Sequence, residues 1–329
     1  MSCKIKFVDY EKDPIDNMTF TNDRCFLCGK ELNDENKTVE HVYPKWLQNK
    51  FDLWNQELIL LNGTMIKYRQ LTIPCCKNCN SIMSSEIEKP MENAVSGGYE
   101  EFIKLDKKNI FQWLNKLSYG MLYKELSLKA DIKEPLSESI YSEKNLRKHY
   151  MQHIFLKTII DKSEFIHQPW SILIFKIKPS NEQDLYWAHD NPIFKTFFIR
   201  MNDIGIISNL MDNGYQEEFY KNFSERRSLL QKEMIPIQFA ELCAEFFYKT
   251  MLFKRDPFFM TVYNIKEQKL KNIISQDISG EAFNDWNNEC FAHILAFYWQ
   301  DWGYTFDDIY EKNGGLLSSL RKVDGTFKV

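Results

Sequence analysis

The chain has 329 residues, of which 44% are hydrophobic and 15% aromatic, so it can bury a large core in one or two domains. Its 42 lysine and arginine residues against 46 aspartate and glutamate residues give a net charge of −4. This balance argues against a dedicated nucleic-acid binder with a broad basic face. Any contact with phosphate groups must be local, or be assisted by a cation or a partner.

No targeting or membrane segment is visible in the sequence. Residues 1–14 lack the apolar run of a secretory signal, and nowhere do about 20 uncharged apolar residues follow one another. We therefore expect no membrane association and a cytoplasmic location.

The first quarter of the chain contains three local patterns that predict structure. Residues 4–10 are typical of a short strand. Asn62–Gly63, between two β-prone runs, predicts a hairpin with a type I′ turn. Residues 81–95 predict a helix whose N-terminus lies near Cys79 to Ser81.

The glycine pair Gly97–Gly98 marks the expected domain boundary. It separates an N-terminal domain, residues 1–97, from a larger α+β domain, residues 98–329, which is rich in aromatic residues and has no internal repeat. Hydrophobic periodicity in the second domain predicts both helices and strands. Helices are expected within residues 107–130, where apolar residues recur from Ile110 to Leu122, and over 143–160, 214–231, 236–254 and 280–300. Strands are expected over 170–179 and 258–263, with a hairpin that turns at Asn202–Asp203.

Five of the eight cysteines lie in two short clusters. Cys25 and Cys28 are separated by two residues, and Cys76 and Cys79 repeat this spacing. In a large chain such clustering favours a metal over disulfides, and two pairs supply the four thiolates of a tetrahedral structural zinc. Cys75 is an alternative to Cys76, although the matching spacing favours Cys76. Unrelated buried cysteines are the alternative to a metal site.

A zinc ion held by four cysteines has no open coordination position, so it stabilises structure and does not activate water. The zinc-closed loop would contain Glu40 and His41. The second cysteine pair would anchor the helix that begins near Cys79.

Together these residues resemble the HNH endonuclease family, the ββα-metal nucleases with a treble-clef-like zinc cluster. The resemblance covers about residues 23–90. It is closest to members that read E-H-[VI]-x-P-[KR]-W-L and end C-N-x-x-[WM]-x-S-x-[LI]-E, which Glu40–Leu47 and Cys79–Glu88 match. It implies an α+β fold in which a zinc-stapled ββα-metal module precedes a larger α+β domain.

The resemblance also implies a role for each matching residue. His41 would be the general base that deprotonates the attacking water. Glu40, in place of the more usual aspartate, and Asn80 would be ligands of a catalytic Mg²⁺ or Mn²⁺. The structural Zn²⁺ would be held by Cys25, Cys28, Cys76 and Cys79.

These residue types suit the hydrolysis of a phosphodiester bond. The ordinary pKa of histidine lies near neutrality, as a general base requires. Oxygen ligands such as Glu40 and Asn80 suit Mg²⁺, which also accepts phosphate oxygens and neutralises the charge that develops on them. Lys45 and Lys77 are cations near these residues that would contact the backbone of a nucleic acid.

Several positions depart from the family pattern. The asparagine that supplies the middle letter of the family name has no certain counterpart, because Asn55 and Asn62 both lie away from its usual place. The lysine often found one helical turn after the counterpart of Asn80 is replaced by Met83. Glu88, at the end of the matched pattern, either reaches toward the site or contacts the second domain.

Each candidate residue also has a structural interpretation. Alone, Glu40 would be a solvated charge at the end of a strand, His41 a packed histidine and Asn80 a helix N-cap. His149 and His153 lie four residues apart on a predicted helix. We expect them to be surface or core residues and not metal ligands.

The expected function is a divalent-metal-dependent endonuclease, with DNA favoured over RNA as the substrate. The resemblance further implies a bacterial defence role against phage, beside an ATPase or a sensor. The C-terminal domain would position substrate, form a homo-oligomer or dock a protein partner. Two alternatives remain: a zinc-dependent nucleic-acid- or protein-binding module that has lost its nuclease site, and a nuclease subunit that is active only in a complex. The eight basic and eight acidic residues of the segment 25–90 favour the latter.

Overall fold

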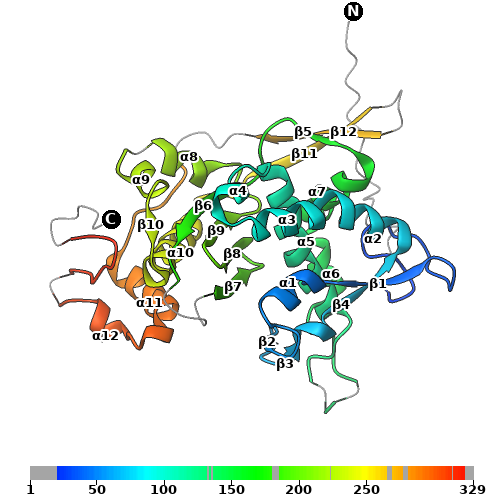
Figure 1. Ribbon diagram of the computed structural model, residues 1–329, viewed down its shortest axis with the longest axis horizontal. Helices are drawn as coiled ribbons and strands as arrows, with labels where there is room; N and C mark the ends of the chain where they lie inside the picture. The colour runs from blue at the N-terminus through cyan, green and yellow to red at the C-terminus, as the bar shows by residue number, and fades with distance from the viewer. Residues whose placement is uncertain are drawn as a thin grey trace, which may run out of the picture. The chain divides into compact units, whose positions relative to one another are not determined.

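Helices and strands are mixed along the chain, which confirms the expected α+β class (Figure 1). The strand expected at residues 4–10 lies outside the described part of the chain. The computed structural model describes residues 21–131, 133–134, 136–179, 185–222, 224–264, 269–276, 281–312 and 314–322.

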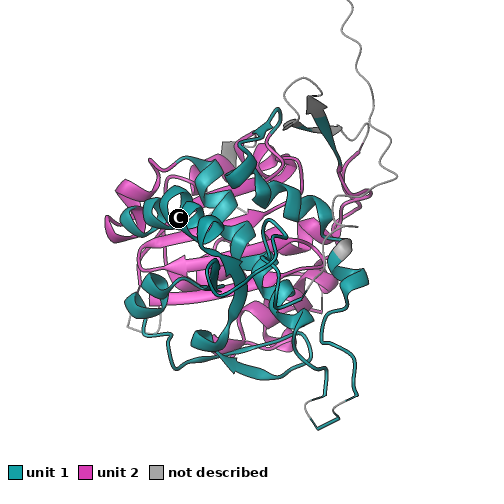
Figure 2. Ribbon diagram, turned by 90° about the vertical axis from the view of Figure 1, so that its right-hand side faces the viewer, with its two compact units in different colours: residues 1–93, 106–167, 259–274 teal, residues 94–105, 168–258, 275–329 magenta. Residues whose placement is uncertain are grey.

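The chain forms two compact units, and each unit draws on separate stretches of sequence (Figure 2). The sequence-based domains, residues 1–97 and 98–329, are continuous segments, whereas the units alternate along the chain. Unit 1 comprises the described residues of 1–93, 106–167 and 259–274, and unit 2 those of 94–105, 168–258 and 275–329.

Two antiparallel strand pairs lie in the N-terminal part of unit 1. In the first pair, β1 (Lys37–His41) runs against β4 (Thr72–Cys76), so that His41 faces Thr72 at the end of the register. The connection between them contains α1 (Lys45–Lys50), the paired strands β2 (Glu57–Ile59) and β3 (Met65–Lys67), and the 3₁₀ turn η1 (Tyr68–Gln70).

The predicted hairpin at Asn62–Gly63 is present, but the prediction of a type I′ turn is wrong. Only Gly63 has a positive φ, of 79°, whereas a type I′ turn needs positive φ at both central residues. The Asn62 side chain donates to the carbonyl of Ala130 (2.8 Å) and accepts from the amide of Thr64 (3.0 Å). These contacts hold a longer loop in place of the two-residue turn.

A continuous helical segment follows β4. It consists of α2 (Lys77–Met83), one turn of π-helix η2 (Ser84–Glu88) and α3 (Lys89–Ser96). The helix starts before the predicted N-terminus because Cys76 acts as its N-cap and accepts a hydrogen bond from the amide of Cys79.

Pro90 explains the π-helical turn. A proline has no N–H to donate, and its ring collides with the carbonyl four residues earlier in a regular helix. That carbonyl belongs to Glu86, and it accepts a hydrogen bond of 2.8 Å from the side chain of Asn109 instead. The widened turn therefore leaves no orphaned carbonyl at Glu86, and it changes the direction in which the following side chains point.

The long helix of unit 1 is α5 (Lys107–Leu126), which begins at the N-cap Asp106. Gly120 lets α5 approach the segment after β1, because a Cβ at this position would lie 3.1 Å from Cγ1 of Val42. The single helix predicted over residues 143–160 is two helices. The remaining elements of unit 1 are α6 (Glu143–Arg147), α7 (Tyr150–Asp161), and the three-stranded sheet of β11 (Phe258–Asn264), β12 (Lys269–Gln276) and β5 (Glu164–Phe165).

Unit 2 contains a five-stranded sheet that is antiparallel except for its β10–β6 edge. The predicted turn at Asn202–Asp203 is confirmed, with φ of 52° at Asn202. Gly205 allows close packing against Phe239, whose ring a Cβ would meet at 2.6 Å. The strands in spatial order are β10 (Glu233–Met234), β6 (Ser171–Ile177), β9 (Ile204–Asn209), β8 (Thr196–Met201) and β7 (Tyr186–Asn191).

The helices of unit 2 supply an aromatic core. The helix predicted over 214–231 is again two helices, and the helix predicted over 280–300 is shorter because Asn287 caps it. None of the described helices is long and apolar enough to span a membrane. The helical elements are α4 (Tyr99–Phe102), α8 (Tyr215–Asn222), α9 (Ser224–Leu229), α10 (Pro236–Met251), α11 (Asn288–Tyr298), the 3₁₀ turn η4 (Gln300–Trp302) and α12 (Phe306–Ile309).

Candidate functional site

The four predicted cysteines meet in unit 1. The sulfur atoms of Cys25, Cys28, Cys76 and Cys79 all lie within 4.8 Å of one another, and three of these residues are buried. The first pair comes from the loop before β1, and the second joins the end of β4 to the first turn of α2. The cluster therefore fits one tetrahedral metal ion such as zinc.

Local backbone geometry explains how each pair forms. Gly29 adopts φ of 71°, which glycine allows without strain, and its amide donates to the carbonyl of Cys25 (2.9 Å). The amide of Cys79 donates to the sulfur of Cys76 (3.4 Å). Backbone amides that point at sulfur stabilise the thiolate form, which is the form that binds metal.

Cys76 rather than Cys75 completes the cluster. Successive residues of a strand face opposite sides, and both cysteines lie at the end of β4. Cys75 is fully buried, and its hydrogen bond with Cys25 together with burial raises the pKa of its thiol. The Cys75 thiol therefore stays protonated next to the cluster, as a packing residue.

A cation would stabilise the ionised form of the cluster. Hydrogen bonds from Cys28, Cys75 and Cys79 lower the pKa of Cys25, whereas the hydrogen bond with Cys25 raises the pKa of Cys28 to about 11. Adjacent thiols cannot all ionise next to one another without a compensating positive charge. A zinc ion would supply that charge.

His149 and His153 are both buried, which is one of the two placements considered for them. His149 contacts the hydroxyl of Tyr141 (2.7 Å) and the side chain of Gln152 (3.0 Å). His153 lies 3.0 Å from the carbonyl of Leu27, between the first two cysteines, and burial lowers its pKa to about 4. A neutral His153 therefore supports the first cysteine pair from α7, a role that the sequence did not reveal.

Glu40 does not lie in a solvent-exposed site. Glu40 is only 6% exposed, and its Oε1 lies 2.5 Å from the Nζ of Lys116 on α5. The side chain of Lys116 is fully buried. Burial raises the pKa of Glu40 to about 7, against the pull of Lys116. The alternative of a solvated charge at the strand end is therefore wrong for Glu40.

Glu88 meets the same ammonium group. Its Oε1 lies 2.6 Å from the Nζ of Lys116, and the π-helical turn carries it there. Burial opposes the charge on Lys116, but Glu40 and Glu88 outweigh it and raise the pKa of this lysine. Lys116 belongs to the second sequence-based domain and also binds Glu40, so the two roles considered for Glu88, a position near the site and a contact with the second domain, coincide.

His41 ends β1 on the opposite strand face from Glu40. Its imidazole is partly exposed and stacks on the indole of Trp54, with ring centroids 5.9 Å apart and planes 19° apart. Burial, with smaller effects from Lys45 and Lys116, lowers the pKa of His41. The ring is therefore mainly neutral at pH 7 and can accept a proton.

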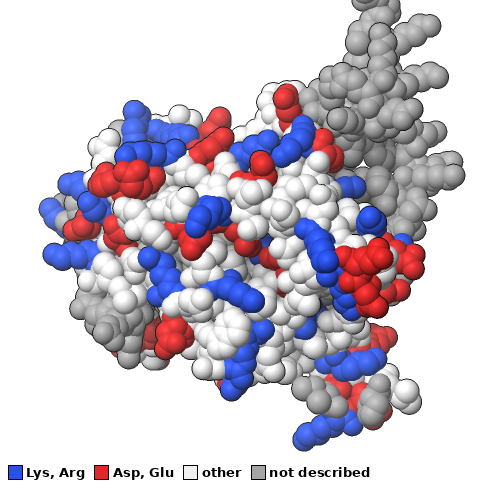
Figure 3. Space-filling model, turned by 45° about the vertical axis from the view of Figure 1, so that its right-hand side comes forward, with Lys and Arg blue, Asp and Glu red and all other residues white. Residues whose placement is uncertain are grey.

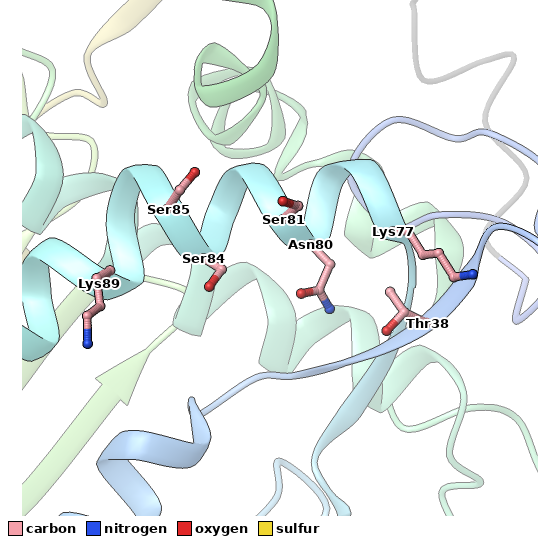
Figure 4. A pocket seen from close by; sticks show the side chains of 7 residues that line it. All are labelled: Thr38, Lys77, Asn80, Ser81, Ser84, Ser85 and Lys89. Atoms are coloured by element: carbon pink, nitrogen blue, oxygen red, sulfur yellow. The ribbon is translucent and has the colours of Figure 1, made fainter.

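Asn80 lies in the first turns of α2 and does not cap the helix, because Cys76 does. Its amide nitrogen lies 3.5 Å from the carbonyl of Val39, two residues before His41. Asn80 also lines an open groove of about 480 Å³ (Figure 4). The groove contains only uncharged polar and basic side chains: Thr38, Lys77, Asn80, Ser81, Ser84, Ser85 and Lys89.

The expected ligands of a catalytic Mg²⁺ or Mn²⁺ do not fit that ion in this arrangement. The Asn80 side chain lines the groove, whereas the Glu40 carboxylate pairs with a buried ammonium group. The two asparagines considered for the middle letter have other partners: Asn55 accepts from Arg69, and Asn62 contacts its own turn and Ala130.

Comparisons with protein families, with curated proteins and with solved structures find no match to this chain. Positive and negative side chains are interspersed over the face drawn in Figure 3. The groove is thus a local basic and polar feature on a chain with a net charge of −4.

Proposed function

We propose that the chain is an endonuclease that hydrolyses phosphodiester bonds in the presence of Mg²⁺ or Mn²⁺, with DNA ahead of RNA as its substrate. One observation carries the proposal. Helix α2 begins inside the four-cysteine cluster and packs on β1, so that Asn80 reaches the carbonyl two residues before His41. A strand that ends in histidine and a helix that bears an amide are thereby held together at one cysteine cluster.

His41 is suited to the role of general base. Its ring is partly exposed and its lowered pKa favours the neutral form. In the proposed reaction the imidazole takes a proton from water, the water oxygen bonds to phosphorus, and the bond to the leaving oxygen breaks. Proton transfer of this kind contributes about 10²–10⁴-fold to a rate.

The groove beside Asn80 supports a contact with a nucleic-acid backbone. Lys77, Ser81, Ser85 and Lys89 line the groove at intervals of four residues along α2, the π-helical turn and the start of α3 (Figure 4). The groove offers the hydroxyl groups of its serines and the ammonium groups of Lys77 and Lys89, of which that of Lys89 also lies 3.0 Å from the carboxylate of Glu92. Such donors suit phosphate oxygens, and no acidic side chain lines the groove itself.

The metal requirement rests on the family resemblance. When bound, a divalent cation would neutralise charge on the phosphate, but Glu40 and Asn80 do not together form a site for it. Because Glu40 pairs with Lys116, we assign no step to a metal on Glu40.

Nicking of a supercoiled plasmid tests the proposal. We expect the wild-type protein to nick it in Mg²⁺ or Mn²⁺ but not in EDTA, and His41→Ala to be slower by about 10²–10⁴-fold. His167→Ala, which removes an exposed histidine of the same unit, should match the wild type. Equal nicking by wild type and His41→Ala would remove the role of His41.

The Glu40–Lys116 pair favours a second candidate, a zinc-dependent binding module without turnover. Such a module would keep the cysteine cluster and the groove and would need no open carboxylate. Retained DNA binding with no nicking by any variant would select this candidate. Nicking that appears only after a partner protein is added would select a nuclease subunit of a complex.

A further inference from the structure

A lysine without solvent exposure lies behind the candidate site. The Nζ of Lys116 contacts two carboxylates, of Glu40 (2.5 Å) and Glu88 (2.6 Å), and two main-chain carbonyls, of His41 (2.7 Å) and Val42 (3.1 Å). These acceptors come from the end of β1, from the residue that follows it and from the π-helical turn. One ammonium group therefore joins three segments of unit 1.

A contribution to folding stability does not explain this buried ammonium group. Removing an ammonium group from water is costly, and an apolar replacement of a buried ion pair is often as stable or more stable. What the buried group provides is geometry, since an ammonium offers three donors and Lys116 has four oxygen acceptors around it.

The fold contains two further features that place Lys116. Gly120, one helical turn later on α5, lets the helix approach Val42 closely. The π-helical turn before Pro90 carries Glu88 to the ammonium group. Both features depart from regular helix design, and both bring partners to the same lysine.

We propose that Lys116 is a positioning residue for His41: its hydrogen bonds to the carbonyls of His41 and Val42 fix the backbone from which the imidazole projects, and its ion pairs keep Glu40 and Glu88 turned inward. The inference rests on the proposed nuclease function for its effect on rate. Since Lys116 is fully buried, it cannot touch DNA. Its loss should change turnover and leave DNA binding unchanged.

Three variants test the inference. Lys116→Met removes the donors but leaves two buried carboxylates, so Lys116→Met with Glu88→Gln is made as well to preserve folding. Lys124→Met on the same helix is the matched control. Zinc content and circular dichroism check the fold, hydrogen exchange of the 37–46 segment reports its order, and kcat, KM and the DNA dissociation constant report function.

We expect the Lys116 variants to exchange faster in the 37–46 segment, with the amide of Val42 losing protection. We expect kcat to fall about 10²-fold, the effect of a misplacement of about 1 Å, with DNA affinity within about twofold of wild type. Lys124→Met should behave as the wild type. Folded Lys116 variants with unchanged exchange and unchanged kcat would overturn the inference. If the wild type cleaves nothing, the proposed function fails, and hydrogen exchange alone still decides the role of Lys116.

Discussion

The ammonium of Lys116 lies 2.5 Å from the carboxylate of Glu40, and both residues are buried. Glu40 and His41 are neighbours on β1, and neighbouring residues of a strand face opposite sides. The pair E-H in the sequence therefore does not present two side chains to one ligand. Of these two neighbouring residues, His41 is the one whose side chain is partly exposed to solvent.

This geometry predicts the behaviour of Glu40→Gln. We expect the Mg²⁺ or Mn²⁺ concentration for half-maximal nicking to stay within about twofold of wild type, because the carboxylate faces Lys116. The free energy of unfolding should fall by about 1–3 kcal/mol, because a charged hydrogen bond in the interior is weakened. Glu57→Gln on the exposed strand β2 is the control. A metal requirement raised tenfold or more would make Glu40 a ligand after all.

The cysteine cluster predicts a clear difference between two adjacent residues. Protein purified without chelators should contain one zinc ion per chain, and Cys75→Ala should retain it. Cys76→Ala should lose most of the zinc and destabilise unit 1, because it removes both a ligand and the N-cap of α2. Metal analysis of both variants decides the matter. Zinc loss in Cys75→Ala with zinc retained in Cys76→Ala would reverse the assignment.

The groove predicts a change in the salt dependence of DNA binding. Replacing both Lys77 and Lys89 by alanine should weaken binding similarly for all sequences. It should also lower the slope of log affinity against log salt by about 2, roughly one for each phosphate contact. The control pair Lys30→Ala and Lys50→Ala removes the same charge from exposed positions outside the groove. An equal loss of DNA affinity and of salt dependence in both double variants would mean that DNA binding depends only on the net charge of the protein and not on the groove.

Unit 2 should lose stability at mildly acidic pH through His189. Its ring is packed among aromatic side chains, and burial lowers its pKa to about 4, below the unfolded value of about 6.5. The neutral ring's contribution is fully present above pH 6.5. As the pH falls from 6.5 toward 4, the free energy of unfolding decreases by at most roughly 3 kcal/mol, because the unfolded chain binds a proton that the folded chain does not.

Denaturant unfolding of His189→Gln between pH 7 and pH 4 checks this expectation. The free energy of unfolding of His189→Gln should depend less on pH than that of the wild type. The control variant His293→Gln, at an exposed position, should keep the pH dependence of the wild type. The same pH dependence in all three proteins would show that His189 does not titrate in this way.

Local patterns predicted the parts of the molecule that local interactions determine. The spacing of Cys25, Cys28, Cys76 and Cys79 was sufficient to predict the cluster, because two-residue spacers let both sulfurs of a pair reach one ion. The turn at Asn202 and the strand β6 followed from residue preferences in the same way.

The long-range contacts were not predictable in this way. Lys116 lies 76 residues after Glu40, on a helix assigned to the other sequence-based domain, so nothing local linked the two. The sequence did contain one hint of a buried lysine. Lys116 is a charged residue inside the apolar-rich run between Trp113 and Gly120, and the structure buries it with its neighbours. The π-helical turn was also missed, although Pro90 inside a predicted helix marks such a break.

Chemical rescue tests the central claim, that His41 is the general base of a nuclease, most directly. The initial rate of plasmid nicking in Mg²⁺ is measured for wild type and His41→Ala with and without added imidazole. We expect His41→Ala to be almost inactive and imidazole to restore part of its rate, because the site of His41 is partly open to solvent, while the wild-type rate stays unchanged. Nicking by His41→Ala at the wild-type rate, without imidazole, would contradict the account.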